Sequence, residues 1–363
     1  MTAHPTTTQM NAIRLEEFGG PDVLHAASVP LPRPDAGWVR IRVSYCGVCR
    51  HDLLTRAGKF PRAIHPLTLG HQVSGIIDEV GEGVEGFSVG DRVMSMIFSG
   101  CGTCANCRGG NQSLCTDITP KFLGEDLDGG YAEYVVIPAS TTVPVPAEVP
   151  LTSAAIVTCT LGTAWHALMT RGQLQAGQDV VITGASGGVG MHAVQIAASQ
   201  GARVVAVTSS EAGAGVARDA GAHDVIVSSE RKFARQLKHD LQRKADLVLE
   251  VVGAPTLRES LHAVKPGGTV VVVGNVEGSE VSIPPAYLIL KEIALVGTKS
   301  CTNRELEALL AEVAAGRLYA DVTEVVEYTR ARDVHERMEA GESTGRIVLE
   351  VSGADAPAAY ATA

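Results

Sequence analysis

The feature that most constrains the fold is a glycine-rich turn set between an apolar strand and a helix. A strand predicted at residues 179–183 runs into Gly184-Ala-Ser-Gly-Gly-Val-Gly190 and then into a helical stretch. Backbone N–H groups at the start of such a helix can face a phosphate with no side chain in the way. The strand before the turn and the helix after it therefore predict a dinucleotide-binding site, whereas the turn alone would be a weak signal.

The pattern around this turn predicts an α/β protein with two domains. From about Leu161, apolar strands (179–183, 203–208, 245–251 and 269–273) alternate with helical stretches, which is typical of a parallel, doubly wound sheet. Between about Ile13 and Pro150, short β-type runs are separated by Gly- and Pro-rich turns, which predicts a compact β-rich domain. A chain of 363 residues suits two such domains.

Charge and composition limit the partners. The net charge is -10 with no basic stripe, which argues against a nucleic-acid partner and favours a small-molecule substrate. We see no run of about 18 apolar residues, so no membrane span is expected. The first residues lack a secretory signal, which favours the cytoplasm. Residues 1–12 are expected to be a disordered tail and residues 353–363 a flexible one.

Four cysteines lie close together in the spacing Cys-x2-Cys-x2-Cys-x7-Cys. A tetrahedral zinc ion needs four soft ligands that converge on one point, and the two-residue gaps let neighbouring thiolates face inward. A pair of disulfides would need an oxidising compartment, which nothing else in the chain supports. The spacing predicts a closed structural zinc site made by Cys101, Cys104, Cys107 and Cys115.

Three further residues, Cys49, His71 and Cys159, are candidate ligands whose wide spacing carries little information. A free cysteine is commonly a small buried apolar residue, and a lone histidine is more often a satisfied core residue. From spacing alone, a metal site and a structural role both stay open.

Several motifs follow one another along the chain in a set order. They are Gly47-Val-Cys49-Arg-His-Asp52, Gly70-His71-Gln72, the cysteine lobe, Gly129-Gly-Tyr-Ala-Glu-Tyr134, Gly184 to Gly190, and Lys265-Pro-Gly-Gly268. In this order they resemble the zinc-containing medium-chain dehydrogenase/reductase family, of the alcohol dehydrogenase type, over nearly the whole chain. The resemblance implies a GroES-like catalytic domain at 13–160 with the zinc lobe at 101–115, a Rossmann domain at 161–299, and a return to the catalytic domain at 300–352.

The resemblance implies a second, catalytic zinc ion, and hence two zinc ions per chain. Cys49, His71 and Cys159 take the ligand places, which leaves the fourth position open for substrate. Asp52 matches the carboxylate that accepts a hydrogen bond from the ligating histidine and fixes its orientation.

The resemblance also implies how a nicotinamide dinucleotide is bound. Gly187, Gly188 and Gly190 would lie under the pyrophosphate, Thr163 beside the nicotinamide, and Arg346 against the phosphates. The full set of expected cofactor contacts is Thr163, Gly184, Gly187, Gly188, Val189, Gly190, Thr208, Ser209, Ser210, Gly274 and Arg346.

Three hydroxyl residues stand where an acid would hold the ribose of NAD. Thr208-Ser209-Ser210 ends the second strand, and the missing acid favours NADP over NAD because it removes repulsion against a 2′-phosphate. No Lys or Arg follows in Ala212-Gly213-Ala214 to complete such a site. The alternative is that these hydroxyl residues only cap the next helix.

Two residues depart from the pattern of the family. His51 stands where alcohol dehydrogenases commonly have Ser or Thr, and its ordinary pKa near 6.5 suits a proton relay; the alternative is a surface imidazole. Gln72 replaces the usual Glu, which removes an anion near the metal.

The expected reaction is hydride transfer between a nicotinamide and an alcohol or carbonyl substrate, with zinc polarising the substrate oxygen. An alternative follows from Gly274-Asn-Val276 and Ile289-Leu-Lys-Glu-Ile293, which resemble the acryloyl-CoA reductase branch: NADPH-dependent reduction of an activated C=C bond in an enoyl thioester or enone. A third possibility is a nucleotide-binding module without catalysis. A homodimer or homotetramer is expected because the run Ile289–Val296 falls where family members pair.

Overall fold

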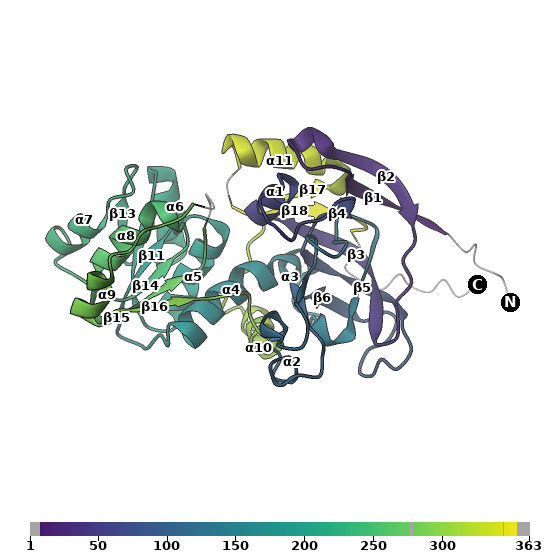
Figure 1. Ribbon diagram of the computed structural model, residues 1–363, viewed down its shortest axis with the longest axis horizontal. Helices are drawn as coiled ribbons and strands as arrows, with labels where there is room; N and C mark the ends of the chain where they lie inside the picture. The colour runs from purple at the N-terminus through teal and green to yellow at the C-terminus, as the bar shows by residue number, and fades with distance from the viewer. Residues whose placement is uncertain (1–7, 276–278, 344, 354–363) are drawn as a thin grey trace. The chain divides into compact units, whose positions relative to one another are not determined.

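The computed structural model describes residues 8–275, 279–343 and 345–353, and the chain folds into two compact units (Figure 1). Unit 1 contains the chain up to Thr158, together with Thr302–Ala315 and the chain from Ala320 onwards. Unit 2 contains Cys159–Cys301 and Gly316–Tyr319.

Unit 1 is built on a seven-stranded sheet, with two smaller sheets beside it. The main sheet has the order β10-β6-β5-β3-β18-β17, and β9 also pairs with β3. Its strands are β3 (Trp38–Val48), β5 (Gln72–Val80), β6 (Arg92–Ser95), β9 (Tyr134–Pro138), β10 (Thr142–Pro144), β17 (Glu324–Glu327) and β18 (Ile347–Glu350). The smaller sheets are β2 (Leu24–Pro30), β1 (Gln9–Leu15) and β4 (Leu67–Thr68), and the pair β7 (Phe98–Ser99) and β8 (Lys121–Phe122).

The core of unit 1 follows from the long strand β3. Val39, Ile41 and Val43 are fully buried at alternate positions, as expected for a strand with one face on the core. The helices of this unit are α1 (Arg50–Arg56), α2 (Ala105–Arg108), α3 (Leu151–Val157), α10 (Asn303–Ala314) and α11 (Ala331–Ala340).

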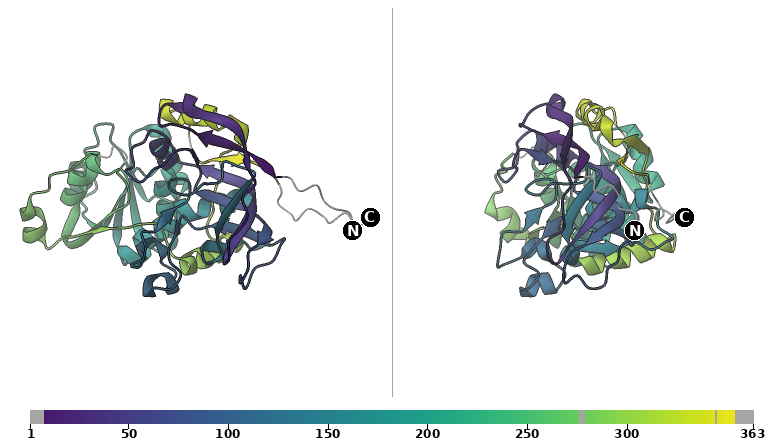
Figure 2. Two further views of the ribbon diagram at one scale, coloured as in Figure 1. Left: turned by 45° about the vertical axis from the view of Figure 1, so that its right-hand side comes forward. Right: turned by 90° about the vertical axis from the view of Figure 1, so that its right-hand side faces the viewer.

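Segments from early and late in the described chain meet in unit 1. β18 pairs antiparallel with β3, with Val348 opposite Gly47. Helix α11 packs beside β2, and Figures 1 and 2 show the yellow helix next to the purple strands from all three directions. The C-terminal segment thus completes the unit that the N-terminal segment begins.

Unit 2 is a six-stranded parallel sheet in the order β13-β12-β11-β14-β15-β16. Numbered along the chain, this is the Rossmann order 3-2-1-4-5-6. The strands are β11 (Asp179–Thr183), β12 (Arg203–Thr208), β13 (Asp224–Val227), β14 (Ala245–Glu250), β15 (Val264–Val272) and β16 (Ala294–Gly297). The prediction of a doubly wound parallel sheet is therefore confirmed.

Helices cross over between these strands. α5 packs on β11 and β12, α6 on β12 and β13, and α8 on β14 and β15, while α7 packs against α8. The helices of unit 2 are α4 (Thr163–Trp165), α5 (Gly188–Ser199), α6 (Glu211–Asp219), α7 (Ala234–His239), α8 (Ala254–Ala263) and α9 (Pro285–Lys291).

The expected N-terminal tail of residues 1–12 was too long. β1 begins at Gln9 and pairs with β2, with Met10 opposite Val29, and Met10 and Ala12 are buried. Alternate apolar residues that pair with a neighbouring strand are ordered by that pairing. Residues 1–7 of that tail and residues 354–363 of the C-terminal one lie outside the described residues.

One helical stretch, Leu151–Arg171, is long and apolar enough to cross a membrane by length and composition, although the sequence analysis expected no such run. It joins α3 and α4 through the π-helical segments Thr158–Gly162 and His166–Arg171. Within its apolar window, 72% is buried inside the protein. Burial among protein side chains accounts for its composition, since a helix that is apolar on most sides belongs in a core.

Candidate metal centres and nucleotide loop

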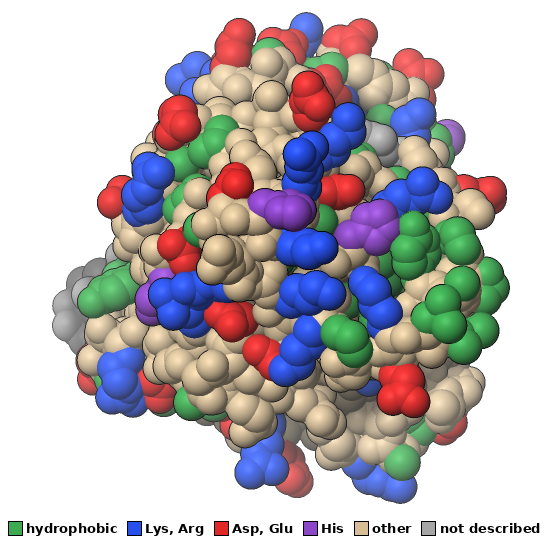
Figure 3. All heavy atoms as spheres, turned by 90° about the vertical axis from the view of Figure 1, so that its left-hand side faces the viewer, with side chains coloured by type: hydrophobic (Ala, Val, Ile, Leu, Met, Phe, Trp, Pro, Cys, Tyr) green, Lys and Arg blue, Asp and Glu red, His purple; other side chains and the backbone are tan. Residues whose placement is uncertain are grey.

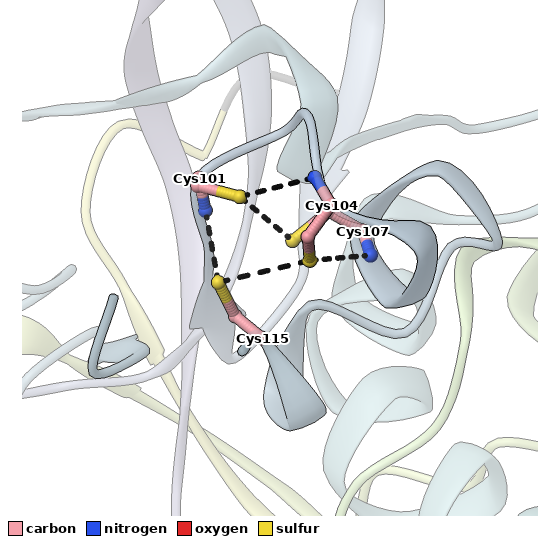
Figure 4. Close-up of side chains that lie close together, drawn as sticks. All are labelled: Cys101, Cys104, Cys107 and Cys115. Carbon is pink, nitrogen blue, oxygen red and sulfur yellow. Dashed lines mark hydrogen bonds between the residues drawn. The ribbon is translucent and has the colours of Figure 1, made fainter. Parts of the chain in front are cut away.

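The four cysteines of the lobe converge on one point (Figure 4). The Sγ atoms of Cys101 and Cys107 are 3.9 Å apart, as are those of Cys104 and Cys115. Thiolates that share one tetrahedral zinc at the usual bond length lie about 3.8 Å apart, whereas disulfide sulfurs lie about 2.05 Å apart. Each of these cysteines is unbridged. The geometry fits a metal ion and not disulfides.

The charges of the lobe also fit a cation. Backbone hydrogen bonds, first at Thr116 and then from Cys107, lower the pKa of Cys104 to about 6 and so stabilise its thiolate. Burial raises the pKa of Cys107 to about 12, and the neighbouring thiols add to this effect. Four thiolates therefore do not coexist here unless a cation offsets their charge, which is what a zinc ion would do.

A second group unites the three scattered ligands. The ligand atoms of Cys49, His71 and Cys159 all lie within 4.8 Å of one another. The distance from Cys49 Sγ to His71 Nε2 is 3.4 Å, close to the roughly 3.6 Å expected for two such ligands of one tetrahedral zinc. Cys159 lies on the π-helical segment that continues α3, and π-turns within helices are frequent at functional sites.

Asp52 positions two of these three ligands. One carboxylate oxygen accepts a hydrogen bond from the Cys49 backbone N–H at 2.8 Å, so it caps α1 where the ligand stands. The other oxygen lies 2.9 Å from His71 Nδ1, which is the contact that the resemblance implied. With Nδ1–H donated to Asp52, the Nε2 lone pair of His71 points at Cys49 and is available to a metal.

The electrostatics of this group favour positive charge. Burial alone would lower the pKa of His71, but the charges of Asp52 and Cys49 outweigh burial and raise it to about 10. For Asp52, burial alone would raise the pKa. The positive charge of His71 and the hydrogen bond that His71 donates outweigh burial and lower the pKa of Asp52. An environment that retains a proton this strongly also attracts a divalent cation that takes the proton's place.

His51 is held by contacts that the sequence did not reveal. Its ring stacks between Phe60 and Phe122, with ring centroids 4.3 Å away on each side. Its Nε2 lies 2.8 Å from Oε2 of Glu125, a buried carboxylate 74 residues further along the chain. These contacts hold the imidazole in one orientation, and its role as a proton relay stays a prediction. Burial lowers the pKa of His51, although the hydrogen bond with Glu125 acts against this change.

Gln72 contacts a cation. Its side-chain oxygen accepts a hydrogen bond of 2.8 Å from Arg346, and both side chains are buried. A Glu at this position would form an ion pair with Arg346, whereas Gln leaves the guanidinium charge undiminished. This contact places Arg346 within unit 1, and its expected role with the cofactor phosphates stays a prediction.

The glycine-rich turn has the shape that a pyrophosphate requires. Gly184 has a φ of +59°, and α5 begins at Gly188, directly after the turn. A Cβ on Gly190 would lie 2.1 Å from the Gly184 carbonyl oxygen, so only glycine allows the helix this close to the strand. Val189 follows in the first turn of α5, and Thr163 begins α4 in the same unit. The residues present fit a dinucleotide.

The three hydroxyl residues after β12 have different roles. Ser210 Oγ accepts a hydrogen bond from the Gly213 N–H and caps α6, and the Thr208 hydroxyl donates to the Ser210 carbonyl. Helix capping, left open from the sequence, therefore applies to Ser210. Ser209 is exposed, and the next residue, Glu211, is an exposed acid in the first turn of α6.

Glu250 is a buried carboxylate that the sequence analysis missed. It ends β14 and accepts hydrogen bonds from Thr183 and Thr256 hydroxyls at 2.8 and 2.6 Å, Val252 and Gly253 N–H groups at 2.9 Å each, and the Ser260 hydroxyl. Thr183 is the residue before the glycine-rich turn. Glu250 thus fixes the carboxyl ends of β11 and β14 together. The sequence feature that could have revealed this residue is a Glu at the end of an otherwise apolar strand.

Gly274 closes the same edge of the sheet. A Cβ on Gly274 would lie 1.9 Å from the Val251 carbonyl oxygen, and one on Gly253 would lie 2.6 Å from the Gly274 carbonyl oxygen. The loops after β14 and β15 therefore pack backbone against backbone. This leaves Gly274 beside the segment that Glu250 holds.

Comparison with known proteins defines the class. The alcohol dehydrogenase GroES-like domain matches residues 35–147, and the zinc-binding dehydrogenase domain matches residues 188–315. The chain belongs to the zinc-containing medium-chain dehydrogenase/reductase family and is an oxidoreductase. The predicted pairing of a GroES-like domain with a Rossmann domain is confirmed.

Individual relatives fall into two groups. An acryloyl-coenzyme A reductase of Metallosphaera sedula is 38% identical over 319 residues, which cover 88% of this chain and 93% of the reductase. An NAD-dependent alcohol dehydrogenase of Sulfurisphaera tokodaii is 31% identical to this chain, and the alignment covers 94% of this chain and 99% of the dehydrogenase. The protein in the crystal structure of AibC is 42% identical to this chain. The two structures align with a TM-score of 0.89 over 97% of this chain and 99% of AibC.

The two ligand groups predict two zinc ions in each chain. Metal analysis of the purified protein should give two, and both Cys49→Ser and Cys104→Ser should give one. Cys301→Ser, which alters a buried cysteine outside both groups, should keep two. A wild-type protein with one zinc ion, or a Cys49→Ser variant that keeps two, would contradict the catalytic site.

Replacement of Glu250 should weaken nucleotide binding as well as the fold. Glu250→Gln loses the charge and turns an amide N–H₂ toward groups that donate, at a cost of about 1–3 kcal/mol in the free energy of unfolding. We expect a dissociation constant for NADPH at least tenfold higher by fluorescence titration. Glu307→Gln, an exposed change on α10, is the control. Lower stability with unchanged NADPH affinity would show that Glu250 supports only the fold.

Proposed function

We propose that this protein is a zinc- and nicotinamide-dependent reductase of an activated C=C bond in an α,β-unsaturated thioester. The observation that carries this choice is the order of the relatives. Two acryloyl-coenzyme A reductases are 38% and 35% identical to the chain, whereas the alcohol dehydrogenase of Sulfurisphaera tokodaii is 31% identical. The residues of both candidate sites support the chemistry that this substrate needs.

When bound, a zinc ion at Cys49, His71 and Cys159 would supply Lewis-acid polarisation of the substrate carbonyl, and NADPH would supply hydride to the β-carbon. The α-carbon must then gain a proton. His51 would carry that proton; the support is that its ring stacks between two phenylalanines and its Nε2 lies 2.8 Å from Glu125 Oε2. Asp52 keeps His71 in the tautomer that can bind metal, and buried Arg346 adds positive charge beside Gln72.

The second candidate is hydride transfer between nicotinamide and an alcohol or carbonyl substrate. The observation that favours it is the complete ligand group of two Cys and one His, with the relatives named alcohol dehydrogenase aligned over 94% of the chain. The same His51–Glu125 pair would then move a proton to or from the substrate oxygen. NADP is proposed as the cofactor in both cases, because residues 208–210 contain no acid.

A substrate screen separates these candidates. NADPH oxidation should be fastest with acryloyl- or crotonyl-coenzyme A, at least tenfold faster than with any aldehyde or ketone. Faster reaction with aldehydes or ketones would replace the first proposal with the second. No oxidation of bound NADPH by any of these compounds in a single turnover would leave only a nucleotide-binding module.

His51→Ala should lower kcat by about 10²-fold, because a positioned proton donor typically contributes 10²–10⁴-fold. Imidazole added to the buffer should restore part of the rate. The control is His25→Ala, which removes an exposed histidine on β2 of the same unit. An unchanged kcat for His51→Ala would exclude the relay.

The cofactor preference can be measured directly. We expect NADP⁺ to bind more tightly than NAD⁺ by calorimetry, since a 2′-phosphate near Ser209 meets no acid within residues 208–210. Glu211 is the residue that would reverse this order, because a carboxylate in the first turn of α6 is stabilised by the helix amino end and can accept from a ribose hydroxyl. Tighter NAD⁺ binding that Glu211→Gln abolishes would overturn the NADP proposal.

A further inference from the structure

Unit 2 carries a basic hollow that the proposed reaction does not use. The hollow has a volume of about 450 Å³ and lies between α7 and α8. Figure 3 faces the side on which α7 lies in Figure 1, and it shows basic side chains gathered beside histidines near the middle of that face. The six basic or imidazole side chains of the hollow are Lys232, Arg235, Lys238, His239, Lys244 and His262.

One carboxylate, that of Glu259, lines the hollow against this charge. Its Oε2 accepts hydrogen bonds of 3.0 Å from the backbone N–H groups of Phe233 and Ala234, and its Oε1 lies 3.9 Å from His262 Nδ1. Lys232 pairs with Glu230 at 3.4 Å, but both are exposed, and such pairs contribute little. Within the described part of the chain, Arg235, Lys238 and Lys244 form no ion pair.

Neighbouring lysines also repel one another. Partial burial and the charge of Lys244 together lower the pKa of Lys291, whose amino group donates to the Leu261 carbonyl at 3.1 Å. The whole chain has a net charge of -10, so this concentration of positive charge runs against its overall balance. Like charges kept close together are destabilising until an anion neutralises them.

The hollow is separate from the dinucleotide turn. Lys244 directly precedes β14, and His262 stands at the end of α8 just before β15, so both mark the amino ends of strands. The glycine-rich turn follows the carboxyl end of β11. In a parallel sheet these ends form opposite edges, and ligands of the Rossmann fold bind at the carboxyl edge.

We propose that this hollow binds a compact polyphosphate, a small molecule with at least three negative charges. Its basic and imidazole side chains come from three segments, residues 232–239, the residue before β14 and the end of α8, and they line one hollow. A stripe would suit an extended acidic polymer, whereas convergence suits several phosphate groups on one small ligand. The volume lies within the range of small-ligand sites. His262 is fixed at the rim by a hydrogen bond of 2.8 Å to the Tyr287 hydroxyl.

Calorimetric titration with inorganic tripolyphosphate tests this site in the intact protein. The dinucleotide site is first saturated with NADP⁺, so that the probe cannot bind there. We expect saturable binding of one tripolyphosphate per chain, weakened by added salt. The double variant Lys238→Glu/Lys244→Glu should raise the dissociation constant at least tenfold. Arg304→Glu, an exposed reversal on α10, should leave it unchanged.

Two controls keep the outcome clear. NADPH affinity and the circular dichroism spectrum of the double variant report whether it folds, and Lys238→Gln/Lys244→Gln replaces it if the reversal does not. Absence of saturable binding to wild type would overturn the proposal. Tripolyphosphate binding by the double variant that equals binding by wild type would show an adventitious ion only, and would also overturn the proposal. Binding of poly-glutamate that the double variant loses, without binding of tripolyphosphate, would identify an acidic polypeptide as the partner. That result would likewise overturn the proposal.

Discussion

The candidate metal centre depends on the two hydrogen bonds of one buried carboxylate. Asp52 accepts from the backbone at Cys49 and from the ring of His71, so it ties the start of α1 to the residue that precedes β5. Neither ligand is close to the other in the chain, and the carboxylate converts that separation into a fixed geometry. A charge buried this deeply persists only because both of its oxygens are engaged. The metal site is thus as much a part of the fold as of the chemistry.

Much of this arrangement follows from local sequence. The strand at 179–183 and the glycines after it specify a phosphate-binding turn because backbone conformation and close approach leave no room for a side chain. The four cysteines of the lobe are close in the chain, so their spacing alone brings them together. For both features, the interactions that matter span only a few residues.

The residues that the sequence did not reveal act across long separations. Glu125 reaches His51 over 74 residues, and Arg346 reaches Gln72 over 274 residues. Hydropathy patterns report which face of a strand is buried but not which buried polar groups find one another. Glu250 is different, since its donors lie on β11 and on the segment after β14, and parallel pairing of these strands brings them together. The extent of β1 was missed because a short alternation near a chain end resembles a polar tail.

The stacking of His51 between Phe60 and Phe122 has a consequence for how substrate range can change. One of the two rings that hold the imidazole, Phe122, also lies beside His71, with ring centroids 5.4 Å apart. A smaller residue in place of Phe122 would open space beside His71, but it would also release the side chain proposed to deliver the proton. A change that admits a bulkier substrate would therefore also loosen the position of His51. New specificities in this chain should arise more readily from residues outside the aromatic stack.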